Sequence, residues 1–269
     1  MSIAATLSGD SPNQDRYILG EGFAAVLDGS TSVAGDRSHD PGWYAGRLGE
    51  ALEPLLPGDK PIADAVAIAI AQVAEAAELV AETSPTSTVA VARWNEDVVE
   101  TYALCDSTVV VLCRDGTDHV HTDDRAGEAV AEHRAEYRAH LEAGHGYDDG
   151  LREILLTLQE QLARHRNVQG GYWVAGADPE AAYEGISHTY SRSDVDGVIL
   201  ATDGVTLERH PRVTTWRELY AEVRTHGADD LLRELLRELH AAEDHDPDGV
   251  RWWRSKRHDD KTLIVTPLS

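Results

Sequence analysis

The chain has 269 residues, of which 48 are acidic and 24 basic, giving a formal net charge of −24. Such a charge repels nucleic acid and anionic membranes, so neither is expected as a partner. A hydrophobic content of 42% is enough for a buried core. Without an N-terminal leader pattern or an apolar run of 18 residues, the sequence predicts a cytoplasmic protein.

The first 82 residues predict a hairpin followed by two helices. Residues 16–19 and 23–27 are strand-like and flank the turn-forming Gly20-Glu21-Gly22. Apolar residues spaced by three or four predict a helix from Gly42 to the stop at Pro57-Gly58, and a second over residues 62–82.

The middle of the chain returns to strand-like sequence. Strands are expected at residues 87–94, 98–105, 108–113 and 119–122, and their short polar connections indicate an antiparallel meander. Residues 123–149 are highly charged, and leucines spaced along residues 151–162 predict a helix after them. We expect the segment 123–175 to form a flap.

The last third predicts a short helix at residues 179–186, strands at 197–201 and 262–265, and helices at 216–223 and 231–239. No linker rich in Pro, Gly or Ser divides the chain. We therefore expect residues 1–269 to form a single α+β domain whose mainly antiparallel sheets are covered by helices.

Three acidic motifs lie beside apolar strands: Val26-Leu27-Asp28-Gly29, Ala201-Thr202-Asp203-Gly204 and Asp259-Asp260-Lys261-Thr262. Carboxylates gathered from distant positions repel one another unless they are protonated or neutralised by a cation. Ligands that are all oxygen favour Mg²⁺ or Mn²⁺. Each Asp-Gly pair by itself is equally explained by an ordinary turn.

Read together and in order, these motifs resemble the metal-dependent type 2C protein phosphatases. The family opens with Asn-Glu/Gln-Asp, continues with a strand ending in Asp-Gly, and closes with Asp-Asn-x-Thr. The matching segments span nearly the whole chain; they are Asn13-Gln14-Asp15, Asp28-Gly29, Ser87-Thr88, Asp106-Ser107, Thr202-Asp203-Gly204 and Asp259-Asp260-Lys261-Thr262.

The resemblance implies a four-layer α-β-β-α sandwich with two mainly antiparallel sheets and two Mn²⁺ or Mg²⁺ ions in a cleft at one edge. Asp28 would bridge the two ions, with the carbonyl of Gly29 as a further ligand. Asp203 and Asp259 would complete the shell of the first ion. Asp15 would orient the water, and Asp106 with Asp203 is the candidate site of a weaker third ion.

The implied reaction is phosphoester hydrolysis by a water that the two metals activate, because bound metals neutralise the phosphate and lower the pKa of water. The substrate would be phosphoserine or phosphothreonine in a protein, or a small phosphoester. The histidines His39, His145 and His258 are candidates for protonating the leaving group.

The sequence departs from the family at three places. Asp10 stands where an arginine often binds the substrate phosphate, which leaves Arg16, Arg37 and Arg192 as candidate substitutes. Cys105 replaces the glycine of Gly-Asp-Ser, and Ser30-Thr31-Ser32 follows Asp28-Gly29 where the family pattern ends in Gly-Gly.

Two other readings stay open. A phosphatase-like regulatory module with weak turnover would keep the acidic residues and lack the arginine. An aspartate-nucleophile phosphatase would need Asp-x-Asp-x-Thr on a parallel sheet, but Val26 and Ser30 fill the positions two residues from Asp28. The hairpin-rich sequence also disfavours a parallel sheet.

Overall fold

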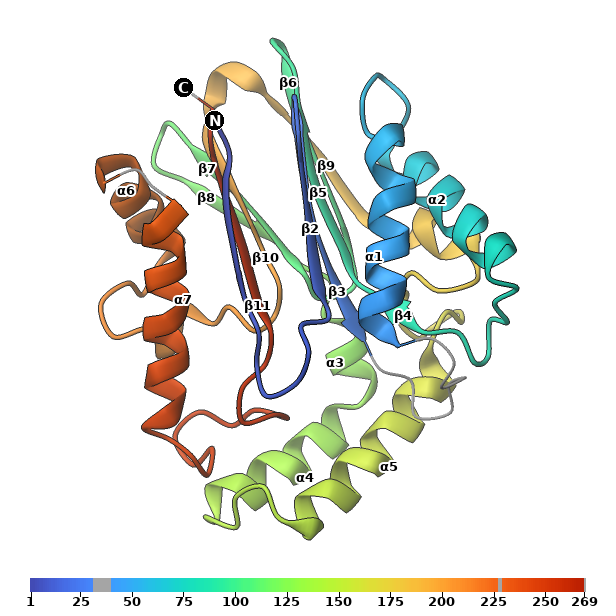
Figure 1. Ribbon diagram of the computed structural model, residues 1–269, viewed down its shortest axis with the longest axis vertical. Coiled ribbons are helices and arrows are strands. Elements are labelled where there is room, and N and C mark those ends of the chain that lie inside the picture. The colour runs from blue at the N-terminus through green and yellow to red at the C-terminus, as the bar shows by residue number, and fades with distance from the viewer. Residues whose placement is uncertain (31–39, 227–228, 269) are drawn as a thin grey trace.

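The computed structural model describes residues 1–30, 40–226 and 229–268, and two facing β-sheets form its centre (Figure 1). The first sheet has the strand order β1-β11-β10-β7-β8, and the second has the order β2-β3-β5-β6-β9 with β4 paired to β3. These pairs are all antiparallel. The strands are β1 (Ile3–Leu7), β2 (Asp15–Gly20), β3 (Phe23–Ser30), β4 (Thr86–Ser87), β5 (Val89–Trp94), β6 (Val98–Leu104), β7 (Thr108–Cys113), β8 (Asp118–His121), β9 (Ile186–Ser191), β10 (Val195–Ala201) and β11 (Lys261–Pro267).

Helices cover the outer face of each sheet, which makes four layers (Figure 1). α1 (Pro41–Leu52) and α2 (Ile62–Ala76) pack on the second sheet, while α6 (Trp216–His226) and α7 (Asp229–Asp244) pack on the first. Short 3₁₀ turns are η1 (Glu53–Leu55), η2 (Pro179–Glu184), η3 (Arg192–Asp194) and η4 (Leu207–Arg209). The expected α-β-β-α sandwich is confirmed.

The continuous apolar sequence of β3 fits its position between two hydrophobic cores. Ala24 and Val26 belong to the core between the two sheets, whereas Ala25 and Leu27 belong to the core under α1 and α2. Since successive side chains of a strand point to opposite faces, a strand in the middle of such a sandwich is apolar along its whole length. Asp28 comes directly after this run, where β3 reaches the end of the sheets.

Three smaller expectations were wrong. The predicted helix 62–82 ends at Ala76, because Glu78 adopts a left-handed conformation (φ 50°) and Val80 is 57% exposed. The expected meander is interrupted, since the chain crosses from the second sheet to the first between β6 and β7. The strands β1 and β9 were not predicted.

A helical segment lies across one end of the sandwich. It comprises α3 (Arg125–Ala129), α4 (Ala131–Glu142) and α5 (Asp149–His165) and has a small core of its own (Figure 1). These helices lie within residues 123–175, and the role of that segment as a flap stays a prediction. The two chain ends lie side by side at the opposite end of the molecule. Among the described residues, no helix has the length and apolar character needed to span a bilayer.

Candidate active site

The hairpin of β2 and β3 places two carboxylates opposite each other. Asp15 begins β2 and is the register partner of Asp28, which lies near the end of β3. Gly29 follows, and a side chain there would meet the backbone of Pro41 at 2.6 Å. Glycine is therefore required at this position by the close approach of the start of α1.

The first sheet brings three further aspartates to the same end of the sandwich. Asp203 lies two residues after β10 and Asp259 two residues before β11, and these strands are paired through Ala201 and Leu263. Asp106 lies two residues before β7, whose first residue is paired with Ala201. Antiparallel pairing thus gathers three sequence-distant residues at one sheet edge.

Hydroxyl groups join the two sheets beneath these aspartates. Thr202 Oγ1 donates a 2.8 Å hydrogen bond to Asp15 Oδ2. Thr88 Oγ1 accepts from the backbone N–H of Asp28 at 3.2 Å and lies 2.5 Å from Ser107 Oγ. These short polar side chains hold the strand ends in place without adding charge to the cluster.

Hydrogen bonds to backbone N–H groups hold the Asn13-Gln14-Asp15 motif in place. Asn13 Oδ1 accepts from the N–H of Asp15 at 2.8 Å, and the Asp260 carboxylate accepts from the N–H groups of Gly9 and Gln14, both at 2.8 Å. Asp260 therefore fixes the loop before β2, while its neighbour Asp259 lines the cleft.

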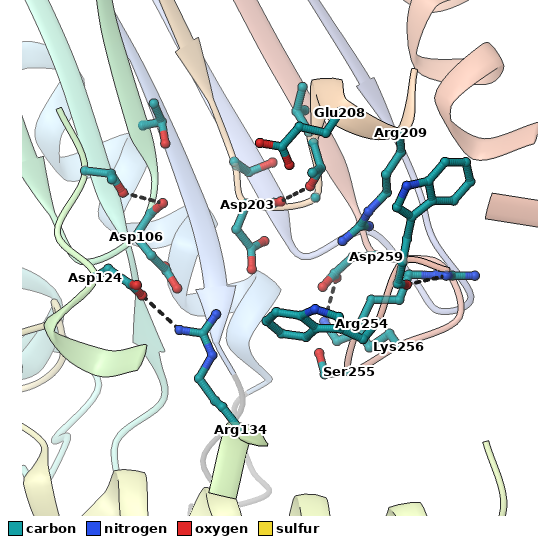
Figure 2. Close-up of a pocket in the computed structure, with 18 of the residues that line it drawn as sticks. Asp106, Asp124, Arg134, Asp203, Glu208, Arg209, Arg254, Ser255, Lys256 and Asp259 are labelled. Atoms are coloured by element: carbon teal, nitrogen blue, oxygen red, sulfur yellow. Dashed lines mark hydrogen bonds and ion pairs between the residues drawn. The ribbon is translucent and has the colours of Figure 1, made fainter. Parts of the chain in front are cut away.

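The aspartates line a cleft between the sheet ends and the helices α3 to α5. One part, of about 510 Å³, is lined by polar and aromatic side chains that include Arg134, Arg209 and Trp252 (Figure 2). The adjoining part, of about 400 Å³, contains Asp28 and is walled by leucines of α5. Both parts share the residues Asp106, Asp203, Ser255, Lys256 and Asp259.

Burial and repulsion from neighbouring carboxylates raise the pKa values of Asp15, Asp28, Asp106 and Asp203. Burial, with added repulsion from Asp260 and Asp259, raises the pKa of Asp15 to about 6. Burial and the charges of Asp15, Asp203 and Asp259 hold the pKa of Asp28 well above its usual range.

The environment also raises the pKa of Asp203, to about 8, first through desolvation and then through the charges of Asp259 and Asp106. Because the Asp203 side chain is open to the cleft, water screens these interactions. Asp15 is only 3% exposed and lacks that screening, so its shift is the firmer one.

The cluster suits hard divalent cations. Within residues 1–30, 40–226 and 229–268, Lys256 is the one cationic side chain that pairs with any of the cluster's five aspartates. Its Nζ lies 2.6 Å from Asp259. Asp15 Oδ1 is buried without a hydrogen-bond partner. Carboxylates so crowded, with oxygen as the ligand atom throughout, fit Mg²⁺ or Mn²⁺. The roles of Asp28, Gly29, Asp203, Asp259 and Asp106 as ligands stay predictions.

A more compact group lies nearby. In the part of the chain that the structure describes, one group of three potential metal-ligating side chains has its ligand atoms all within 4.8 Å of one another. It consists of His240, Glu243 and His258. Both Glu243 oxygens are already occupied, Oε1 by Arg209 at 3.0 Å and Oε2 by Lys261 at 2.9 Å. This group is therefore neutralised, whereas the more open aspartate cluster is not. Openness suits Mg²⁺, which usually keeps several waters.

The two described candidate proton donors, His258 and His145, contact other groups than the aspartate cluster. His258 is 6% exposed and lies 3.1 Å from both Glu243 and Asp244. His145 packs against His140, with ring centroids 4.8 Å apart. His39, together with Arg37 and the Thr31-Ser32 pair, lies outside the described residues.

Two cleft residues were missed in the sequence. Arg134 enters the cleft from α4 and pairs with Asp124 at 3.1 Å, and Lys256 pairs with Asp259 (Figure 2). A signal for Lys256 existed, because the chain has only three lysines and two of them flank Asp259. No local pattern distinguishes Arg134 from the other charged residues of its helix.

Comparison with solved structures shows the fold of the bacterial PPM serine/threonine phosphatases. The chain is similar over its full length to Stp1 from Staphylococcus aureus (14% identity, 94% of that chain, TM-score 0.57) and to MsPP from Mycobacterium smegmatis in complex with cacodylate (18%, 98%, 0.56). It is also similar, over 99% of its length, to the catalytic domain of PstP with two manganese ions (16%, 97%, 0.53). No protein-family model and no curated protein matches the sequence.

Proposed function

We propose that this protein is a metal-dependent phosphoester hydrolase acting on phosphoserine or phosphothreonine in proteins. The observation that carries the proposal is the convergence of Asp28, Asp106, Asp203 and Asp259 from both sheets on one cleft, with the buried Asp15 beside Asp28 and, among the described residues, one paired cation. The PPM phosphatase fold supports it.

In this proposal Asp28 and Gly29 bind two Mn²⁺ or Mg²⁺ ions, Asp203 and Asp259 bind the first, and Asp106 assists a third. Divalent ions in such a site supply charge neutralisation for the phosphate and an activated water. Asp15, buried and fixed by Thr202, orients that water. The role of the chain is to hold these carboxylates in place before substrate arrives.

The test is hydrolysis of p-nitrophenyl phosphate and of a phosphoserine peptide with Mn²⁺ or with EDTA. Asp28→Asn should reduce Mn²⁺-dependent turnover by about 100-fold or more, because a ligand shared by two ions is lost. The matched control is Asp230→Asn, whose side chain is 92% exposed on α7. Turnover that persists in EDTA or in Asp28→Asn would contradict the proposal.

The regulatory-module alternative has its own outcome in the same experiment. It predicts no turnover of either substrate, together with calorimetric binding of Mn²⁺ that Asp203→Asn weakens. Hydrolysis of p-nitrophenyl phosphate without hydrolysis of the peptide would instead favour a small phosphoester as the substrate.

A further inference from the structure

The position at which the family often carries its phosphate-binding arginine serves another purpose here. Asp10 Oδ2 accepts a 3.1 Å hydrogen bond from the N–H of His258, and the N–H of Asp10 donates to the carbonyl of His258 at 3.3 Å. Asp10 therefore joins the loop before β2 to the loop before β11. As a carboxylate it repels phosphate.

The two described candidate substitutes, Arg16 and Arg192, are engaged elsewhere. Arg16 donates to the carbonyl oxygens of Asn13 and Asp15 at 2.8 and 2.7 Å, which ties its guanidinium to the turn. Arg192 lies just before β10, bonded to the carbonyl of Leu268. The aspartates lie beyond the other end of this seven-residue strand, roughly 20 Å away.

Two of the cations lining the cleft are structural. Arg209 pairs at 3.0 Å with Glu243, which is 1% exposed. Arg254 is 6% exposed and pairs with Asp246 at 3.0 Å. Arg254 compensates the nearly buried Asp246, and Arg209 shares the buried Glu243 with Lys261, so both guanidinium groups are held by buried carboxylates.

Lys256 differs from both. Its side chain is 52% exposed, Asp259 is its one carboxylate partner in the described part of the chain, and it lines both parts of the cleft. The charge and hydrogen bond of Asp259, with the charges of Asp28 and Asp203, outweigh burial and raise the pKa of Lys256. The ammonium group is thus permanently charged beside the aspartates.

The backbone at Lys256 is anchored while its side chain can turn. Tyr147 Oη donates to the carbonyl oxygens of Arg254 and Lys256 at 3.3 and 3.2 Å. Arg254 also donates to the carbonyls of Trp252 and Arg257, both at 2.8 Å. A half-exposed ion pair such as Lys256–Asp259 is screened by water and contributes little to stability, so the ammonium exchanges partners easily.

We propose that Lys256 binds the phosphoryl oxygens of the substrate, in place of the arginine that the family carries at the position of Asp10. This inference rests on the proposed function. A divalent ion bound by Asp259 competes with the ammonium for the same carboxylate, and a phosphate dianion then offers the ammonium a new partner. Lys256 reaches the aspartates from the loop before β11, whereas Arg134 enters from α4 (Figure 2).

The experiment compares Lys256→Met, Arg134→Met and the exposed control Lys60→Met in three measurements. Calorimetry gives the affinity for Mn²⁺ alone and for inorganic phosphate on the Mn²⁺-loaded protein, and steady-state kinetics gives kcat and KM for p-nitrophenyl phosphate. Lys256→Met should weaken phosphate binding and raise KM by about 10- to 100-fold, the range for a hydrogen bond between charged groups, with a smaller change in kcat.

The affinity for Mn²⁺ in Lys256→Met should stay the same or increase, because the competing cation is gone. Lys256→Arg should recover part of the phosphate affinity, and Lys60→Met should match the natural chain. The proposal is overturned if Lys256→Met binds phosphate normally, if only Arg134→Met loses it, or if Lys256→Met loses Mn²⁺. Phosphate binding that depends on Lys256 in a protein without turnover would support this inference and reject only the hydrolase.

Discussion

Buried charge is paired in the loop of residues 246–257 and largely unpaired in the aspartate cluster that this loop faces. In the loop, Asp246 accepts hydrogen bonds from the N–H groups of Arg251 and Trp252 and from the guanidinium of Arg254. These bonds outweigh the effect of burial and lower the pKa of Asp246. Across the cleft, no donor among the described residues bonds the carboxylate of Asp203, and its pKa rises to about 8.

The difference indicates which region is built for stability and which for binding. The loop pairs its buried side chains Asp246 and Arg254 with each other and is packed onto the helical segment, with Trp253 edge-on to Tyr137 at a centroid distance of 5.5 Å. The cluster leaves its charges unsatisfied, so its geometry depends on the strands that carry it. Unsatisfied carboxylates on a rigid scaffold are the arrangement expected of a cation site.

Removing the charge partner in the loop should have the largest effect on stability. Arg254→Met leaves Asp246 nearly buried and unpaired, which should cost about 3–5 kcal/mol in urea unfolding. Arg47→Met, which breaks an ion pair whose side chains are 57% and 67% exposed, should cost no more than about 1 kcal/mol. Equal costs for the two variants would contradict the contrast drawn here.

The cluster should show its repulsion as a pH dependence of stability in EDTA. The folded pKa of Asp15, about 6, lies above the ordinary value of 3.8 for an aspartate. Its contribution is therefore fully present below about pH 4 and is lost as the pH rises to about 6. Between these limits the natural chain should lose about 2 kcal/mol relative to Asp15→Asn, measured by urea unfolding. If the unfolding free energies of the natural chain and of Asp15→Asn changed in parallel with pH, the raised pKa of Asp15 would be contradicted.

Substitution of Cys105, where the chain crosses between the sheets, should have the smallest effect on stability. Cys105 is buried and has φ 66°, a left-handed conformation at the position where the family has glycine. Cys105→Gly relieves about 1–2 kcal/mol of backbone strain and loses a comparable amount of burial, so stability should change by less than about 1 kcal/mol. Cys105→Val, β-branched, should cost about 2 kcal/mol. A valine tolerated as well as glycine in thermal unfolding would disprove the conformational requirement.

The wrong and missing elements share a cause. β9 has the sequence Ile-Ser-His-Thr-Tyr-Ser and is largely exposed at the edge of its sheet, so it lacks the apolar alternation that marks a strand. The meander prediction failed at Asp106 because a short polar turn is equally compatible with a hairpin and with a crossing between sheets. Local patterns report which residues are strands, and pairing partners are decided by packing.

The sequence by itself determined that aspartates such as Asp28 and Asp203 lie beside apolar strands, because strand periodicity and turn residues are local properties. It also predicted the layered α+β class. Only the tertiary structure decided that Asp10 is bonded to His258 and that Lys256 lies against Asp259. Those contacts depend on how loops far apart in the chain pack around the sheet ends, and no spacing of residues along the chain encodes that packing.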